Sequence, residues 1–248
     1  MWKWLHCFED PEQAYKLSGT MLPWFSFLAI LLVGTGSIWG LVFAPTDYQQ
    51  GDSYRIIFIH VPAASMSMIA YMTMAVSSLV GLVWKIKSAD WAAAAIAPIG
   101  AMMTFIALLT GATWGKPMWG TWWVWDARLT SELVLLFLYL GIISLYASFE
   151  DKVLAARASG ILAIVGIINI PIIKYSVDWW SSIHQPSSIK FTEKSSMSTD
   201  MLYPLLINIV GFGAMIVAIT LIRYRTEILA RNGMRTWVRD LAITEEAK

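Results

Sequence analysis

The chain alternates between long apolar runs and short breaks that carry turn residues or charges, as at 44–47 (A-P-T-D) and 85–88 (K-I-K-S). A helix needs about 20 mostly apolar residues to cross the hydrocarbon core of a bilayer. Six runs approach or exceed this length. The pattern therefore predicts an all-α, polytopic integral membrane bundle of six transmembrane helices, with spans at about 21–43, 56–84, 91–113, 129–149, 157–175 and 202–223.

Composition supports a chain that lies in the membrane. Hydrophobic residues make up 57% of its 248 residues, charged residues 14%, and the mean hydropathy is +0.59. A soluble domain of this size carries more charge, so we expect a single membrane domain over residues 1–248, surrounded by lipid. The net charge of +1 points to no nucleic-acid partner. Cys7 is the single cysteine, which excludes an internal disulfide, a C-x-x-C-H haem attachment site and a cysteine metal cluster.

Six spans place both termini on the same side of the membrane. Of the 18 basic residues, twelve fall on that side and six on the other, so the positive-inside rule predicts cytoplasmic termini. Six of the twelve lie from residue 223 onward, and without them the count is even. Residues 224–248 are expected to form a basic cytoplasmic tail. The long connections 44–55, 114–126 and 176–201 then face outward, where we expect function.

The connection after the third span is rich in tryptophan. It reads W-G-K-P-M-W-G-T-W-W-V-W-D over 114–126 and holds five of the 14 tryptophans. Tryptophan at a membrane surface is usually an interface anchor, because its ring is apolar and its N–H needs a polar partner. Five of them, interspersed with glycine and proline, predict more than an anchor. We interpret 114–126 as a short amphipathic platform on the periplasmic face that suits a large planar ligand.

The conformation of this segment decides which of its side chains act together. A helical segment would place Trp119, Trp122 and Asp126 on one face. An extended segment would place Trp123 and Trp125 on one face instead. The sequence leaves both alternatives open.

Two histidines are expected on the same side as the tryptophans. His60 lies near the outer end of the second span and His184 in the third outer segment, whereas His6 lies in the cytoplasmic leader. A lone histidine at the interface is usually a satisfied polar group. Two that converge beside an aromatic platform can supply both axial positions of a haem iron. Zinc fits less well, since two histidines without cysteine make a poor tetrahedral set.

A porphyrin also carries two propionates, which require cationic partners. Arginine pairs a carboxylate through two parallel hydrogen bonds, so Arg55 and Arg128 on the outer face are the candidate partners. Asp126 has three alternatives: it contacts the ligand, caps the fourth helix, or pairs with Arg128.

The motif W-G-x-x-x-W-G-x-W-W-x-W-D, with its outward-facing histidines in a multi-span chain, resembles the WWD haem-handling family of cytochrome c assembly. The six spans, the chain length and the positions of His60 and His184 are similar to the haem exporter protein C (CcmC) family of the bacterial cytochrome c maturation system. The resemblance covers essentially the whole chain. The larger synthetases, which attach haem to apocytochrome, have many more spans and further histidines.

This resemblance implies a haem b site at the periplasmic surface of the bacterial inner membrane, with His60 and His184 as axial ligands of the iron. The function it implies is cytochrome c biogenesis, in which this chain presents haem to a partner. The residues that match the motif, and to which ligand binding is carried over, are Trp114, Trp119, Trp122, Trp123, Trp125 and Asp126.

The resemblance also implies partners. Haem would pass to CcmE, a membrane-anchored periplasmic haem chaperone that binds it covalently. The other expected partners are a small membrane protein, CcmD, and the ABC transporter subunits CcmA and CcmB. This chain has no Walker A motif, so an ATP-driven step needs another chain.

Three other functions remain as alternatives. A haem-b electron-transfer subunit would use the same histidines, but would normally bury them within the bundle. A haem permease needs no polar path, because haem is itself apolar. A structural subunit would use its tryptophans only as an interface belt. The sequence shows no Ser/His/Asp or Cys/His arrangement, so independent catalytic chemistry is not expected.

Overall fold

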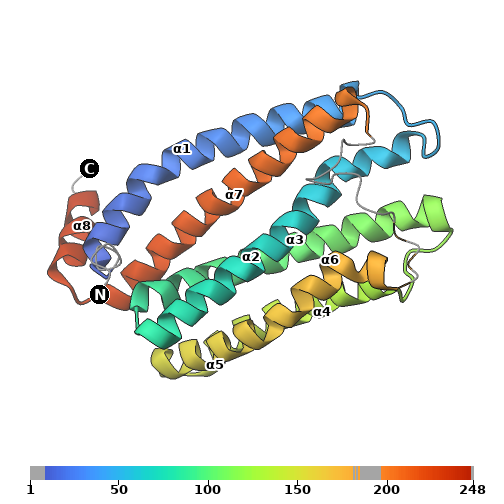
Figure 1. Cartoon of the computed structure of the whole chain (residues 1–248). Helices are drawn as coiled ribbons and strands as arrows, with labels where there is room; N and C mark the ends of the chain where they lie inside the picture. The colour runs from blue at the N-terminus through green and yellow to red at the C-terminus, as the bar shows by residue number, and fades with distance from the viewer. Residues whose placement is uncertain (1–8, 181, 183, 185–196, 247–248) are drawn as a thin grey trace.

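The protein is a bundle of long helices (Figure 1), seen in a computed structural model that describes residues 9–180, 182, 184 and 197–246. In these residues the regular structure is helical, apart from one isolated bridge between Asp47 and Gly51. The elements are α1 (Pro11–Ile38), η2 (Trp39–Phe43), η3 (Asp52–Ile56), α2 (Ile57–Trp84), α3 (Lys87–Trp119), α4 (Ala127–Ser148), α5 (Lys152–Val165), η4 (Gly166–Ile168), α6 (Asn169–Trp179), α7 (Thr199–Asn232) and α8 (Thr236–Glu246).

Six of the helical segments are long and apolar enough to cross a membrane, which confirms the predicted all-α bundle with six spans. The fifth span is α5 and α6 joined by the 3-10 turn η4. The helices extend beyond the apolar runs that predicted them. α1 begins at Pro11, where Asp10 caps it by accepting the N–H of Glu12, and α3 continues to Trp119.

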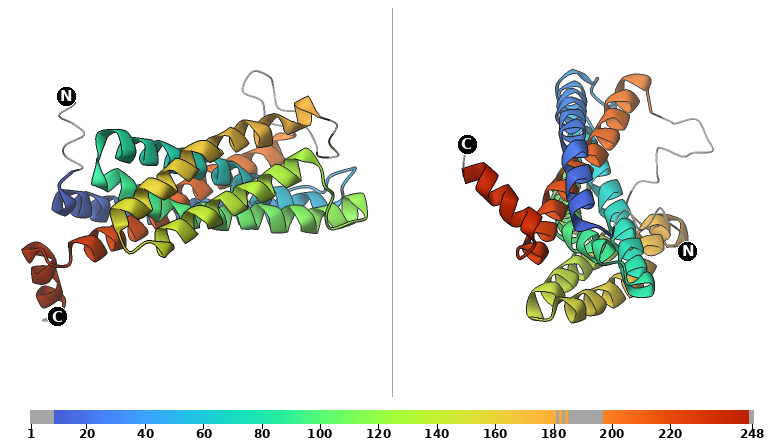
Figure 2. Two further views of the ribbon diagram at one scale, coloured as in Figure 1. Left: turned by 90° about the horizontal axis from the view of Figure 1, so that it is seen from below. Right: turned by 90° about the vertical axis from the view of Figure 1, so that its left-hand side faces the viewer.

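The helices form two outer groups around a central pair. α2 and α3 pack against each other along their length, with α1 and α7 on one side and α4, α5 and α6 on the other (Figures 1 and 2). The largest core cluster lies where α2, α3 and α4 meet. Its centre is an edge-to-face pair, Tyr71 and Tyr139, whose ring centroids are 5.1 Å apart and which are both fully buried.

The pairing of α1 with α7 depends on glycines. Helices in a membrane gain little from excluding water, so close packing of small residues stabilises their association. Gly36 of α1 lies against Asn208 of α7, and an added Cβ would lie 2.7 Å from the Asn208 Oδ1. Gly211 of α7 lies against the α1 backbone, where a Cβ would be 2.8 Å from the nitrogen of Val33. Both positions therefore require the absence of a side chain.

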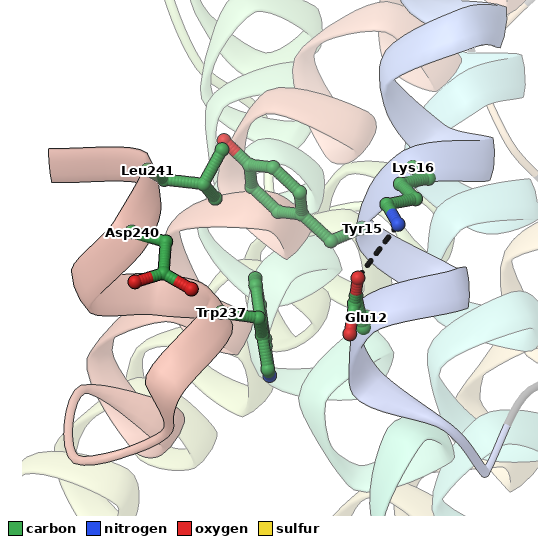
Figure 3. A pocket seen from close by; sticks show the side chains of 6 residues that line it. All are labelled: Glu12, Tyr15, Lys16, Trp237, Asp240 and Leu241. Atoms are coloured by element: carbon green, nitrogen blue, oxygen red, sulfur yellow. Dashed lines mark hydrogen bonds and ion pairs between the residues drawn. The ribbon is translucent and has the colours of Figure 1, made fainter. Parts of the chain in front are cut away.

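The opposite end of the bundle from the 44–51 connection holds the C-terminal helix α8 (Figure 1). Trp237 of α8 lies beside Tyr15 of α1, with ring centroids 5.7 Å apart. A pocket opens between these two helices (Figure 3), and its lining residues are Glu12, Tyr15, Lys16, Trp237, Asp240 and Leu241. The tail was predicted over residues 224–248, and its described part contains the end of α7 and a helix that contacts α1.

We expect Gly211→Ala to destabilise the protein by roughly 1–3 kcal/mol, because its Cβ would meet backbone atoms of α1 that cannot rotate away. Gly34→Ala is the matched control. It is another helical glycine of the same pair, and an added Cβ would meet no atom within 4 Å. The midpoint of thermal unfolding in detergent should fall for Gly211→Ala and stay level or rise for Gly34→Ala. Equal midpoints for the two variants would contradict the packing described here.

Candidate functional site

The tryptophan segment adopts two conformations, one after the other. Trp114 to Trp119 continue α3 as helix, and the segment then turns and runs without regular structure to Asp126. Gly120 ends the helix with a φ of +76°, a conformation that glycine adopts without steric cost, and its N–H donates to the carbonyl of Lys116. The helical alternative, which placed Trp119, Trp122 and Asp126 on one helix face, is not realised, because Trp122 and Asp126 lie beyond the end of α3.

The helical part forms the base of the candidate site. The indole rings of Trp114 and Trp119 meet edge to face with centroids 5.0 Å apart. The Nε1 of Trp114 donates a hydrogen bond of 3.0 Å to the Oε1 of Gln50, in the connection after α1. Gly115 lies under the ring of Trp119, where an added Cβ would lie 3.0 Å from the indole. Two outer connections are thus joined at this pair of rings.

His60 is in the first turn of α2 and is held by α3. Its Nδ1 lies 3.0 Å from the carbonyl oxygen of Ala107 and 3.0 Å from the hydroxyl of Thr110. A carbonyl can only accept, so the contact with Ala107 places the proton on Nδ1 and leaves Nε2 with its lone pair. Gly111 makes room for the imidazole, since an added Cβ would lie 3.2 Å from its Cε1. The position of the His60 ring is thus set by three residues of α3.

The structure brings His184 to the same place from the far end of the sequence. The ring centroids of His60 and His184 are 6.4 Å apart with an interplanar angle of 31°, and His184 is also 6.4 Å from the ring of Trp119. Both imidazoles are half-buried. The described residues contain no group of three or more His, Cys, Asp or Glu that could hold a metal ion.

Asp126 is a structural residue in this arrangement. It is the N-cap of α4, and its Oδ1 accepts the backbone N–H of Leu129 at 2.8 Å. Its Oδ2 accepts the hydroxyl of Ser182, and the same hydroxyl oxygen accepts the backbone N–H of His184 at 3.0 Å. Of the three alternatives for Asp126, the described contacts show the helix cap.

The other three tryptophans of the segment lie apart from the histidines. Trp123 and Trp125 meet edge to face with centroids 5.5 Å apart, as expected for an extended segment. Trp122 is 58% exposed and Trp125 75% exposed. No ring contact links these three residues to the histidine pair within the described part of the chain. Trp122 and Trp125 thus present exposed indole rings, whereas the Nε1 of Trp123 is buried.

The two candidate arginines have different surroundings. Arg55 donates from Nε to Asp52 at 3.0 Å and from Nη1 to the carbonyl of Gly40 at 3.1 Å, so it supports the connection after α1. Arg128 is half-buried and has no hydrogen-bond or ion-pair partner among residues 9–180, 182, 184 and 197–246. The carboxylates near its charge are those of Glu132, Asp126 and Asp178. Arg128 is the arginine available to a ligand.

A buried polar group lies below the site, one helical turn after Arg128. Glu132 is 8% exposed, and its Oε1 accepts the hydroxyl of Ser67 at 2.9 Å. The hydroxyl of Tyr139 donates to the carbonyl of the same serine. The sequence pattern assigned Glu132 no role. It also missed Gln50 and Ser182, because nothing in their local pattern marks them.

Known proteins resemble this chain over its full length. A family model described as "Heme exporter protein C" matches residues 4–239. A protein of that name from Haemophilus influenzae is 53% identical over 244 residues, which cover 98% of this chain and 99% of the relative. One from Escherichia coli K12 is 52% identical over 248 residues and 100% of both chains, and one from Bradyrhizobium diazoefficiens is 47% identical over 90% and 84%. The chain belongs to the haem exporter protein C family.

Proposed function

We propose that this protein binds haem b between His60 and His184 and presents it to a partner. The observation that carries the proposal is the 6.4 Å between the two imidazole centroids. A metal–imidazole bond is about 2 Å long and the nitrogen lies about 1 Å from its ring centre, so two imidazoles on opposite sides of one metal have centres about 6 Å apart. The distance of 6.4 Å between the two rings matches the spacing of two axial ligands.

The surroundings of His60 support its role as a ligand. Histidines that bind metals usually donate their second ring N–H to a carbonyl or carboxylate, which fixes the tautomer and the direction of the ring. The Ala107 carbonyl and the Thr110 hydroxyl occupy that position here. When haem is bound, its iron accepts the imidazole lone pairs, and this chain supplies orientation rather than acid–base chemistry.

The tryptophans serve two purposes in this proposal. Trp119 lies next to His184, and with Trp114 it forms an apolar wall for the porphyrin, worth roughly 1–3 kcal/mol for each well-placed ring. Trp122 and Trp125 belong to the outer surface, and Trp123 packs against Trp125. Two of these three are largely exposed, which suits a surface that a partner covers during haem transfer.

We assign one propionate to Arg128. Glu132, Asp126 and Asp178 lie near the charge of Arg128, but its guanidinium makes no hydrogen bond within the described residues, and a carboxylate fits its two parallel donors. Arg55 remains a prediction for the other propionate. It would bind haem only by sharing its guanidinium with Asp52 and the Gly40 carbonyl.

The direction of transfer follows from the proposed topology. We infer that both termini are cytoplasmic and that the histidine end of the bundle faces the periplasm of a bacterial inner membrane, as the count of basic residues predicts. Haem would then be handed to the chaperone CcmE, with CcmD and the ABC subunits CcmA and CcmB as further partners. The relatives' name, heme exporter, is consistent with delivery on the outer side.

The position of the histidine pair favours delivery over electron transfer. His60 is the fourth residue of α2, at the end of the bundle where the connections meet, and His184 lies outside the helices. A haem held for electron transfer is normally buried within a bundle, whereas a haem at the end of one leaves an edge open to a partner.

We expect the purified protein with haem to show a low-spin, two-histidine optical spectrum. His60→Ala and His184→Ala should each remove one axial ligand, so the spectrum of each variant becomes high-spin or loses its haem signal. The control is His6→Ala, which changes the histidine outside the described residues and should leave the spectrum unchanged. A haem spectrum that stays the same in both His60→Ala and His184→Ala would contradict the proposal. The tryptophans would then be interpreted as a docking surface.

For Arg128→Ala we expect haem affinity to fall about tenfold, since a hydrogen-bonded charged group contributes about 1.5–3 kcal/mol. The dimethyl ester of haem, which lacks free carboxylates, provides the matched test. Wild type should bind the ester more weakly than haem, and Arg128→Ala should bind the ester as well as wild type does. Titration followed by absorbance measures all four combinations. A loss that is the same for haem and ester would show that Arg128 has no propionate partner.

A further inference from the structure

A chain of three polar groups links the backbone of His184 to the start of α4. The N–H of His184 donates to the Oγ of Ser182, at 3.0 Å, and the hydroxyl of Ser182 donates to the Oδ2 of Asp126. The other oxygen of Asp126 accepts the N–H of Leu129 in the first turn of α4. A long helix is therefore connected to the histidine through a single serine side chain.

The chemistry of the three groups determines which group donates and which accepts in each hydrogen bond. A backbone N–H only donates and an ionised carboxylate only accepts, so the serine hydroxyl must accept from His184 and donate to Asp126. Serine has one proton and two lone pairs, which is what this position requires. Because the acceptor is charged, the bond to Asp126 belongs to the stronger class of hydrogen bonds.

The place of His184 in the fold explains why such a connection matters. α6 ends at Trp179 and α7 begins at Thr199, so His184 belongs to neither helix. His60, by contrast, is part of α2 and is held by α3 through Ala107 and Thr110. A ligand pair needs both imidazoles at a set distance from the metal, and the histidine outside the helices needs a separate support.

We propose that Ser182 is a positioning residue that holds His184 at the distance from His60 at which both imidazoles ligate one haem iron. This inference rests on the proposed function, because it concerns the strength of the His184 bond in a site where haem is bound. The aspartate of the WWD motif then acts through Ser182. Asp126 connects the first turn of α4 to His184 through Ser182, in addition to capping the helix.

Ser182→Ala tests the proposal more cleanly than a change at Asp126, because it leaves the cap of α4 intact. We expect the ratio of six-coordinate to five-coordinate haem to fall about tenfold, since one hydrogen bond with a charged partner is lost. The optical spectrum should show a high-spin fraction with His60 still bound. Added imidazole should restore the low-spin spectrum of this variant, because it replaces the weakened ligand.

Two matched variants separate positioning from a general effect of losing a serine. Ser182→Thr keeps the hydroxyl and should retain the wild-type spectrum. Ser144→Ala removes a serine hydroxyl that bonds only the Leu140 carbonyl of its own helix in the described contacts, and it should also behave as wild type. If Ser182→Ala does not accumulate, Asp126→Asn replaces it. Asparagine caps the helix as well as aspartate does but puts an amide in place of the charged acceptor, so an intermediate high-spin fraction is expected.

The outcomes distinguish this inference from the proposed function. If wild type shows no two-histidine spectrum, or His184→Ala leaves it unchanged, the proposed function itself is wrong. If wild type and His184→Ala behave as proposed but Ser182→Ala or its replacement stays fully low-spin and does not respond to imidazole, only the role of Ser182 is wrong. Complete loss of haem in Ser182→Ala, with haem retained in His184→Ala, would also overturn the positioning role.

Discussion

The bilayer constrains this protein more than any single contact does. Its core offers no water, so each spanning segment must satisfy its backbone hydrogen bonds within its own helix, and irregular backbone is confined to the ends of the bundle. Polar side chains that act on a ligand are costly at mid-depth and are therefore expected where helices end. The candidate site follows this constraint. His60 starts α2, Trp119 ends α3, Asp126 starts α4, and His184 lies between α6 and α7.

Within this constraint, each histidine is held in its own way. The Nδ1 of His60 contacts the Ala107 carbonyl and the Thr110 hydroxyl of α3, so the direction of its ring depends on the packing of α2 against α3. His184 depends on side chains that bridge connections, through Ser182 and the cap of α4. In the proposed function, His60 is the ligand on a rigid helix and His184 the ligand in a connection. This arrangement suits a cargo that is bound and later released, because the second ligand can be withdrawn without disturbing the bundle.

The sequence predicted the helices better than their ends. Six apolar runs were sufficient for the six spans, because the length of a run is set by the thickness of the membrane. The ends depend on local caps and on packing, and α3 continues six residues past the predicted boundary, as far as Gly120 allows. The histidines and tryptophans were identifiable by residue type and topology. Gln50 and Ser182 were not, because a glutamine or serine in a connection acquires its role only when the fold brings a partner to it.

The central claim is that one haem iron binds both His60 and His184. Electron paramagnetic resonance of the ferric haem protein, with hyperfine spectra of samples grown with ¹⁵N-labelled histidine, tests it most directly. The account predicts a low-spin ferric signal in which two histidine nitrogens couple to the iron, and in which each of the variants His60→Ala and His184→Ala retains one coupling at most. A wild-type iron that couples to one histidine nitrogen, or to none, would contradict the account.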